Sequence, residues 1–153
     1  MITYGKMTQE ELGSCAKLAA EAFYDYAFFS IYIPKDEQRR RFIDALIKCE
    51  LKANFGKKEV TFYTAKEDGE IVALAQLCDP GFKMPSAFTY IRSGCLGAIR
   101  KGGIRQVLSW FSMEEKAGKP CHELPGKHWY LSMYTVKKGH QEKASEADSC
   151  RIF

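Results

Sequence analysis

The stretch HWYLSMYTV at residues 128–136, followed by KKGHQ at residues 137–141, decides which fold this chain can adopt. The first segment is rich in aromatic and β-branched residues and predicts a buried strand. The second brings two lysines and a glycine directly after that strand, as the entry to a phosphate-binding loop does. The further glycines of such a loop do not follow, because residues 142–153 are the polar stretch EKASEADSCRIF.

The rest of the chain predicts a mixture of helices and strands. Its first half gives, in order, a strand at 2–6, a helix opened by the capping box TQEE at 8–11 and running to about 23 or 24, an aromatic loop to 32, and an amphipathic helix from about 36 to before Gly56. Its second half begins with a hairpin of strands 59–66 and 70–78 around the turn Glu67-Asp68-Gly69. Two helices within 86–118 follow, joined at 101–103 and ended by Gly118 and Pro120. The strand at 128–136 comes last.

Length and composition predict one ordinary globular domain. The chain has 153 residues, 46% of them hydrophobic and 27% charged, which suits a single core and excludes a disordered chain. The formal charge of +4 is only mildly basic and does not distinguish a polyanionic small ligand from nucleic acid. No stretch approaches the roughly 18 apolar residues of a membrane span, and the amino terminus lacks a secretory signal. We therefore expect a soluble, cytoplasmic protein without a membrane partner.

Cysteine and histidine usage argues against metal or disulfide chemistry. The six cysteines are scattered without a Cys-x-x-Cys pair, and the chain has three histidines. Zinc sites and disulfide frameworks need closer or more regular spacing. We expect no metal site, and most cysteines as small core residues.

The predicted order of elements resembles the amino-terminal part of the GNAT superfamily of acyl-coenzyme A N-acyltransferases. That order is a strand, two helices, two strands, further helices, and an apolar strand that runs into a loop headed by Gln141. The family motif is a strand ending in Val, then Q/R-x-x-G-x-G/A; LSMYTV at 131–136 matches the strand, and Gln141 matches the first motif position. The resemblance implies an α/β (α+β) fold, with a mainly antiparallel four-stranded sheet flanked by helices and a helical insertion before the fourth strand. Residues 1–141 would be an incomplete GNAT-like domain, and residues 142–153 an aberrant tail.

The same resemblance implies acetyl-CoA as cofactor and transfer of its acetyl group to a primary amine by direct attack. It places the pantetheine arm along the end of the strand and the phosphates beside the loop. The implied cofactor-binding residues are Tyr134, Thr135, Val136, Lys137, Lys138, Gly139, His140 and Gln141. Without the rest of the resemblance, a plain core strand is the better interpretation of the 128–136 segment, since apolar strands are common.

The closing residues 142–153 depart from the family. Residues 142–153 can be encoded with synonymous codons chosen so that one extra guanine nucleotide after the Gln141 codon shifts the reading frame to GKGIGSRLLQDF. This sequence completes the motif as Q-G-K-G-I-G and continues as the start of an amphipathic helix. This compatibility suggests a frameshifted, prematurely terminated GNAT-like protein with impaired activity and weak coenzyme binding. A tail with a role of its own is the alternative.

The aromatic stretch FYDYAFFSIY at 23–32 lies where GNAT-like proteins shape the pocket of the acceptor amine, which could be a small molecule or a peptide. The residues that we expect to bind substrate are Tyr24, Tyr26 and Tyr32, for their hydroxyls, and Asp25, for its attraction to a cationic amine. Phe28 and Phe29 are equally suited to filling the core. We assign no catalytic residue: the helix carboxylates Glu114, Glu115 and Glu123 match solvated side chains, and His128 and His140 match strand-end and loop positions.

Two other function classes remain open. One class is a basic nucleic-acid-binding module, suggested by Arg39-Arg40-Arg41 together with Arg92, Arg100, Lys101 and Arg105. A solvated helix face explains the arginine triplet better. A catalytically dead interaction protein is the other class. The strand at 128–136 would form an exposed sheet edge in an incomplete domain, which predicts a homodimer through this strand.

Overall fold

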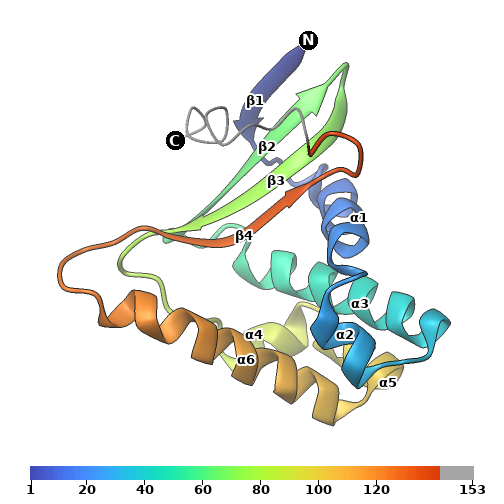
Figure 1. Ribbon diagram of the computed structural model, residues 1–153. Coiled ribbons are helices and arrows are strands. Elements are labelled where there is room, and N and C mark those ends of the chain that lie inside the picture. The colour runs from blue at the N-terminus through green and yellow to red at the C-terminus, as the bar shows by residue number, and fades with distance from the viewer. Residues whose placement is uncertain (142–153) are drawn as a thin grey trace.

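The protein is α+β, with one four-stranded antiparallel sheet and six helices in the part described by the computed structural model, residues 1–141 (Figure 1). The aberrant-tail prediction for residues 142–153 lies outside the described residues. The elements follow in the order β1 (Ile2–Lys6), α1 (Leu12–Phe23), α2 (Ala27–Tyr32), α3 (Asp36–Asn54), β2 (Val60–Glu67), β3 (Glu70–Cys78), α4 (Ala87–Arg92), α5 (Cys95–Gly102), α6 (Ile104–Glu123) and β4 (Tyr130–Val136).

The sheet has the strand order β1-β2-β3-β4, with every neighbouring pair antiparallel. The β2–β3 turn places Asp68 and Gly69 at φ 52° and 86°, as a two-residue hairpin turn requires. The predicted hairpin, the antiparallel sheet and the strand at the start of the chain are therefore confirmed. Between β3 and β4, Gln76 pairs with Met133 and Leu77 pairs with Leu131, so Ser132 is the extra residue of a β-bulge.

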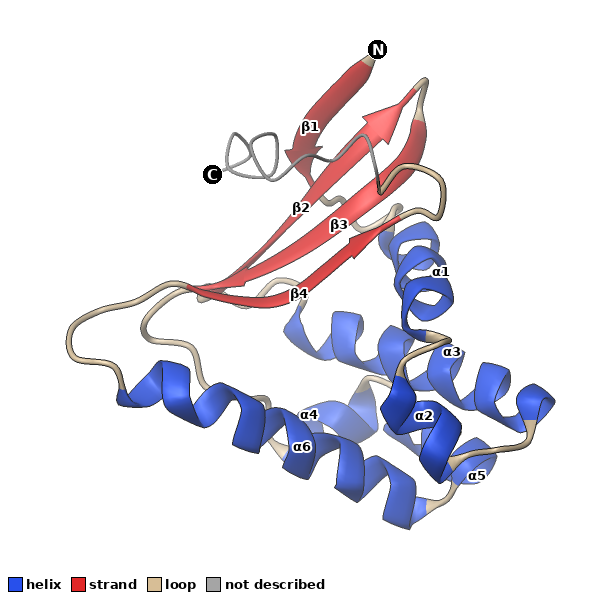
Figure 2. Ribbon diagram, viewed as in Figure 1, coloured by secondary structure: helices blue, strands red, loops and turns tan. Residues whose placement is uncertain are grey.

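The helices lie together on one side of the sheet and enclose the core (Figure 2). Phe42, Leu46 and Ile47 of α3 are fully buried against the helix-facing residues of the strands, such as Leu74. Burying side chains of this size contributes roughly 1.5–3 kcal/mol each, so α3 is the main support of the core. Cys15, Cys49, Cys78 and Cys95 are buried free thiols, as expected of core cysteines.

The aromatic segment contains a short helix, α2, where the sequence predicted a loop. Phe29 of α2 is fully buried and stacks on Trp110 of α6, with ring centroids 4.8 Å apart. No side chain caps α2. The packing of Phe29 therefore holds these residues in a helix. The neighbouring sequence contains no helix-start signal that would have predicted it.

The insertion before β4 contains three helices where two were predicted. The expected junction at Gly103 is present, but Gly94, at φ 105°, adds a break between α4 and α5. The predicted end of the last helix at Gly118 and Pro120 is wrong, because α6 continues to Glu123. Pro120 lies in the final turn, where it removes only one backbone hydrogen bond, and Lys119 and Glu123 form an ion pair at 3.6 Å around it.

Within residues 1–141, no helix combines the length and the apolar character needed to cross a membrane.

Candidate functional site

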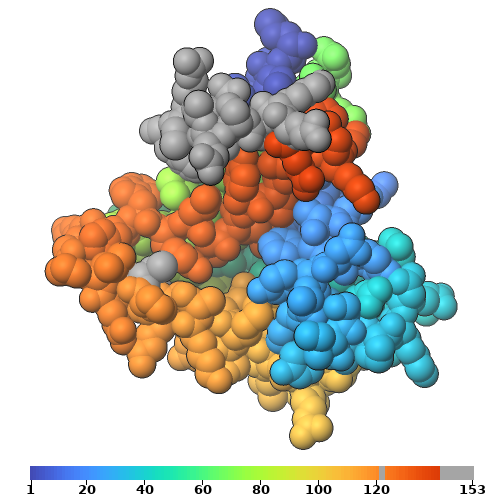
Figure 3. All heavy atoms as spheres, viewed as in Figure 1, coloured from blue at the N-terminus to red at the C-terminus, as the bar shows by residue number. Residues whose placement is uncertain are grey.

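A cavity of about 540 Å³ lies between α3, α6 and the bulged part of β4. Figure 3 shows α6 and β4 on the same face of the molecule, with α2 beside α6. The polar side chains that line the cavity come from helices and strands far apart in the sequence: Glu50, Asn54, Gln76, Glu114 and Ser132. Aromatic and methionine side chains make most of the remaining wall, including Phe23, Tyr26, Tyr90, Trp110, Met113 and Met133.

Helix α3 brings Glu50 and Asn54 to the cavity, one turn apart on the apolar face of the helix. Each is only 4% exposed. The Asn54 Nδ2 donates to the backbone carbonyl of Glu50 at 3.1 Å, which fixes the side-chain amide. The other end of the amide, Oδ1, is buried and has no hydrogen-bond partner in the described structure.

Helix α6 brings Glu114 to the opposite wall, and the two carboxyls interact directly. Burial raises the pKa of Glu50, and the neighbouring Glu114 and Trp110 side chains partly oppose that rise. Burial also raises the pKa of Glu114, and both the charge of Glu50 and the hydrogen bond to it raise the pKa further. Because burial raises the pKa values of both groups and they hydrogen-bond to each other, the two carboxyls share a proton as a pair.

Trp110 lies beside this carboxyl pair and forms the floor of the cavity. Its side chain is 3% exposed, and its indole group lowers the pKa of both glutamates. The Nε1–H nevertheless completes no hydrogen bond of ordinary geometry with any described residue. Tyr90 also lines the cavity, and burial, followed by the charges of Glu50 and Glu114, raises the pKa of its hydroxyl.

One of the four residues predicted to bind substrate lines this cavity. Tyr26 does so and is 45% exposed. Tyr32, which is 52% exposed, lies in a separate groove between α2 and α6, and Asp25 is exposed outside both. Tyr24 accepts a hydrogen bond from Arg39 at 3.0 Å and belongs to the packing of α1 against α3.

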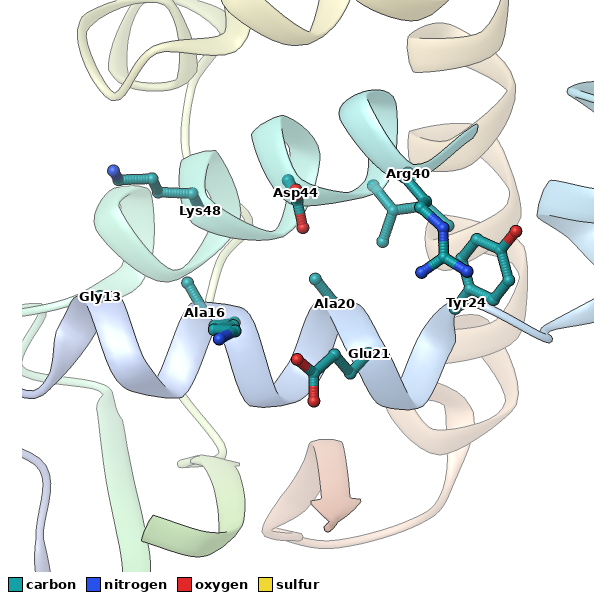
Figure 4. Close-up of a pocket in the computed structure, with 10 residues that line it drawn as sticks. Gly13, Ala16, Ala20, Glu21, Tyr24, Arg40, Asp44 and Lys48 are labelled. Atoms are coloured by element: carbon teal, nitrogen blue, oxygen red, sulfur yellow. The ribbon is translucent and has the colours of Figure 1, made fainter. Parts of the chain in front are cut away.

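A second hollow, of about 400 Å³, lies between α1 and α3 (Figure 4). Ala16 and Ala20 of α1 face α3, and the small side chains allow the two helices to approach closely. The Arg40 guanidinium lies 4.0 Å from the centroid of the Tyr24 ring. This hollow is a consequence of helix packing, and its charged rim contains both signs in Lys17, Glu21, Asp44 and Lys48.

The segment predicted to bind the cofactor extends from β4 into a turn over the β2–β3 hairpin. Thr135 is buried, Val136 is half-buried, and Tyr134 is 38% exposed. The turn is closed by the His140 N–H donating to the Lys137 carbonyl at 3.0 Å, with Gly139 at φ 88°. Lys138 and Gln141 are exposed.

The described part of this segment does not fit a pyrophosphate. Lys137 pairs with Glu70 at 2.6 Å and His140 with Glu67 at 2.8 Å. The Lys137 N–H donates to the Val72 carbonyl, so the turn does not present a run of free N–H groups. Two carboxylates beside the turn would also repel a phosphate.

The arginine triplet that suggested nucleic-acid binding is paired within its own helix. Arg39 and Arg40 contact Asp36 at 2.9 and 3.4 Å, and Arg41 pairs with Glu37. Arg40 and Arg41 match the solvated-face interpretation, whereas the Arg39 side chain is only 14% exposed and donates a hydrogen bond to Tyr24. Among residues 1–141, no three His, Cys, Asp or Glu side chains gather closely enough to hold a metal ion.

Compared with known protein families and with curated proteins, the sequence gives no match.

The two glutamates of the cavity were missed in the sequence. The expectation that Glu114 is a solvated surface carboxylate is wrong, and Glu50 was not among the predicted site residues. A signal was nevertheless present: Glu50 follows Leu46 and Ile47 at helical spacing, and Glu114 follows Val107 and Trp110 in the same way. A charged residue inside an apolar helix face is expensive to bury, and such residues concentrate at functional sites.

Proposed function

We propose that this chain is a GNAT-like N-acetyltransferase and that the cavity between α3 and α6 is its acceptor-amine site. The observation that carries the proposal is the position of the Glu50–Glu114 pair in the same cavity as the β-bulge at Ser132. The strand that would lie beside an acyl donor therefore faces two groups able to handle protons. Acetyl-CoA is the donor that the resemblance implies, and it supplies an activated acyl group.

The chain's own residues would hold and deprotonate the amine. An ammonium ion must lose a proton before its nitrogen can attack a carbonyl carbon. A carboxylate of the pair accepts that proton, and the aromatic walls exclude water from the amine. In the overall transfer a C–N bond forms, the C–S bond breaks, and the departing sulfur takes up a proton.

The described residues support the acceptor half of such a site better than the coenzyme half. The carboxylates beside Lys137 and His140 predict weak coenzyme binding by these residues. We expect the chain carrying GKGIGSRLLQDF in place of residues 142–153 to bind acetyl-CoA more tightly than the original chain, since glycines leave backbone N–H groups open to phosphates.

The direct test is acetyl transfer by both chains from acetyl-CoA to a panel of primary amines, with the product identified by mass spectrometry. The proposal expects an acetylated amine, with a higher rate for the glycine-containing chain. The matched control is the same chain with the three introduced glycines changed to alanine. Failure of both the original and the glycine-containing chain to acetylate any amine, although folded, would refute the proposed function.

A further inference from the structure

The cavity between α3 and α6 contains more hydrogen-bonding capacity than the described protein satisfies. The buried Asn54 Oδ1 accepts no hydrogen bond, although the bond from Nδ2 to the Glu50 carbonyl holds the amide in place. Buried polar atoms in folded proteins nearly always have partners. The orphaned Asn54 oxygen therefore indicates that a ligand with N–H or O–H groups belongs here.

The other acceptors that line the same cavity define the charge of that ligand. The Glu50 and Glu114 carboxyls and the Asn54 amide oxygen can all accept hydrogen bonds. A primary ammonium has three N–H donors and one positive charge, which matches three acceptors around a carboxyl pair. No group of three His, Cys, Asp or Glu side chains among the described residues could hold a metal ion, so an ammonium fits these acceptors better than a divalent cation does.

The walls define the rest of the ligand. Tyr26, Trp110, Met113 and Met133 present aromatic and thioether surface around the polar end. Aromatic faces attract cations and bury apolar groups. A cavity of about 540 Å³ is in the range of small-molecule sites and too small for a folded partner.

We propose that this cavity binds a small primary amine with one ammonium group and an apolar body, that Glu50, Glu114 and Asn54 hold the ammonium, and that binding releases the proton shared by the two carboxyls. One carboxyl O–H bond of the pair breaks, the proton goes to solvent, and no other covalent bond changes. The inference rests on the proposed function in treating the cavity as the acceptor site. It concerns binding alone, and it can be tested without an acetyl donor.

The shared proton is the one that binding must displace, because the other groups around the pair keep their protonation state. Burial raises the pKa of the Cys49 thiol to about 12 and also raises the pKa values of Cys95 and Tyr90, so these groups stay neutral. Lys83, after β3, and Glu115, on α6, are the remaining charged side chains that line the cavity.

Titration calorimetry of the full chain with 2-phenylethylamine at pH 7, in two buffers of different ionisation enthalpy, tests the proposal. We expect a dissociation constant of about 1 mM or tighter, with release of roughly one proton per amine. The neutral analogue 2-phenylethanol should bind at least about tenfold more weakly, because it lacks the charge. A second ammonium, as in 1,4-diaminobutane, should give no gain in affinity.

Carboxyl-to-amide variants locate the site. Glu114→Gln should abolish the proton release, and the double variant Glu50→Gln, Glu114→Gln should weaken binding by about tenfold or more. Glu123→Gln is the matched control, because this exposed acid of the same helix lies outside the cavity lining and should leave both quantities unchanged. Replacing buried acids by amides removes a desolvation penalty, so the variants should fold, which circular dichroism can check.

Each outcome separates this inference from the proposed function. No binding of 2-phenylethylamine at 10 mM, equal binding of the alcohol, or unchanged binding by the double variant would overturn the inference, even if the protein acetylates other amines. Binding without proton release would overturn the assignment of the shared proton. Proton-linked binding without acetyl transfer would support the inference and count against the proposed function.

Discussion

Glu50 of α3, which is buried, and Glu114 of α6, which is half-buried, form a hydrogen-bonded carboxyl pair at the cavity, with the pKa values of both raised chiefly by burial. The pair crosses the interface between a core helix and the helix inserted before β4. It therefore couples the site to the stability of the fold. Its protonation state should be visible in how stability depends on pH.

The first prediction concerns that pH dependence. Both folded-state pKa values lie above the ordinary 4.5, so the stability contribution of the pair is complete below that value and is lost as the pH rises through the folded values. A pKa that differs by one between the folded and unfolded states corresponds to about 1.4 kcal/mol. Glu114→Gln should therefore reduce the fall in unfolding free energy between pH 5 and pH 8 by about 1 kcal/mol or more, measured by urea denaturation. Glu115→Gln should leave this decrease in unfolding free energy unchanged. If the unfolding free energies of the wild type and Glu114→Gln decreased equally between pH 5 and pH 8, Glu114 would not belong to a proton-sharing carboxyl pair.

The second prediction concerns the anchor of α2. Phe29 is fully buried against Trp110 and Phe42, whereas Ile31, two residues later, is 73% exposed. Phe29→Ala should cost about 3–5 kcal/mol of unfolding free energy. Ile31→Ala should stay within about 0.5 kcal/mol, since surface substitutions rarely do more. Similar losses for the two variants in thermal or urea unfolding would show that α2 is not held by Phe29.

The third prediction concerns the contact of α5 with α3. A Cβ at Gly102 would lie 2.1 Å from Cδ2 of Phe42, whereas a Cβ at Gly97 meets no atom within 4 Å. Gly102→Ala should lower stability by about 1–3 kcal/mol through overpacking. Gly97→Ala, in the same helix, should raise stability by up to about 1 kcal/mol through helix propensity. A stabilising Gly102→Ala would mean that α5 does not pack on Phe42 as described.

The fourth prediction concerns self-association. β4 is the outermost strand on its side of the sheet within residues 1–141, and Leu131 of this strand is 44% exposed. We expect a homodimer through the 128–136 segment, because an apolar edge invites pairing with another chain. Sedimentation should show a concentration-dependent dimer that Leu131→Lys weakens. Ile104→Lys, at an exposed site on α6, is the control, and a strict monomer at high concentration would exclude the dimer.

The hairpin, α1 and α3 could be predicted from sequence because their signals are local: a turn pair at Asp68-Gly69, a capping box, and apolar residues at helical spacing. In the capping box, the Thr8 N–H donates to Glu11 at 3.0 Å. The carboxyl pair could not be predicted, because Glu50 and Glu114 are 64 positions apart in the chain and meet only when α6 packs on α3. Helix α2 could not be predicted for the same reason, because it depends on packing against Trp110, which is distant in the sequence.

Nuclear magnetic resonance of the full chain with ¹³C-labelled glutamate carboxyls tests the central claim most directly. The Glu50 and Glu114 resonances would be assigned with the Gln variants and followed through a pH titration, with and without 2-phenylethylamine. We predict that at pH 7 at least one of the two carboxyls remains protonated and that the amine shifts its resonance to the carboxylate position. Titration of both carboxyls near the ordinary glutamate value, with no response to the amine, would contradict the account.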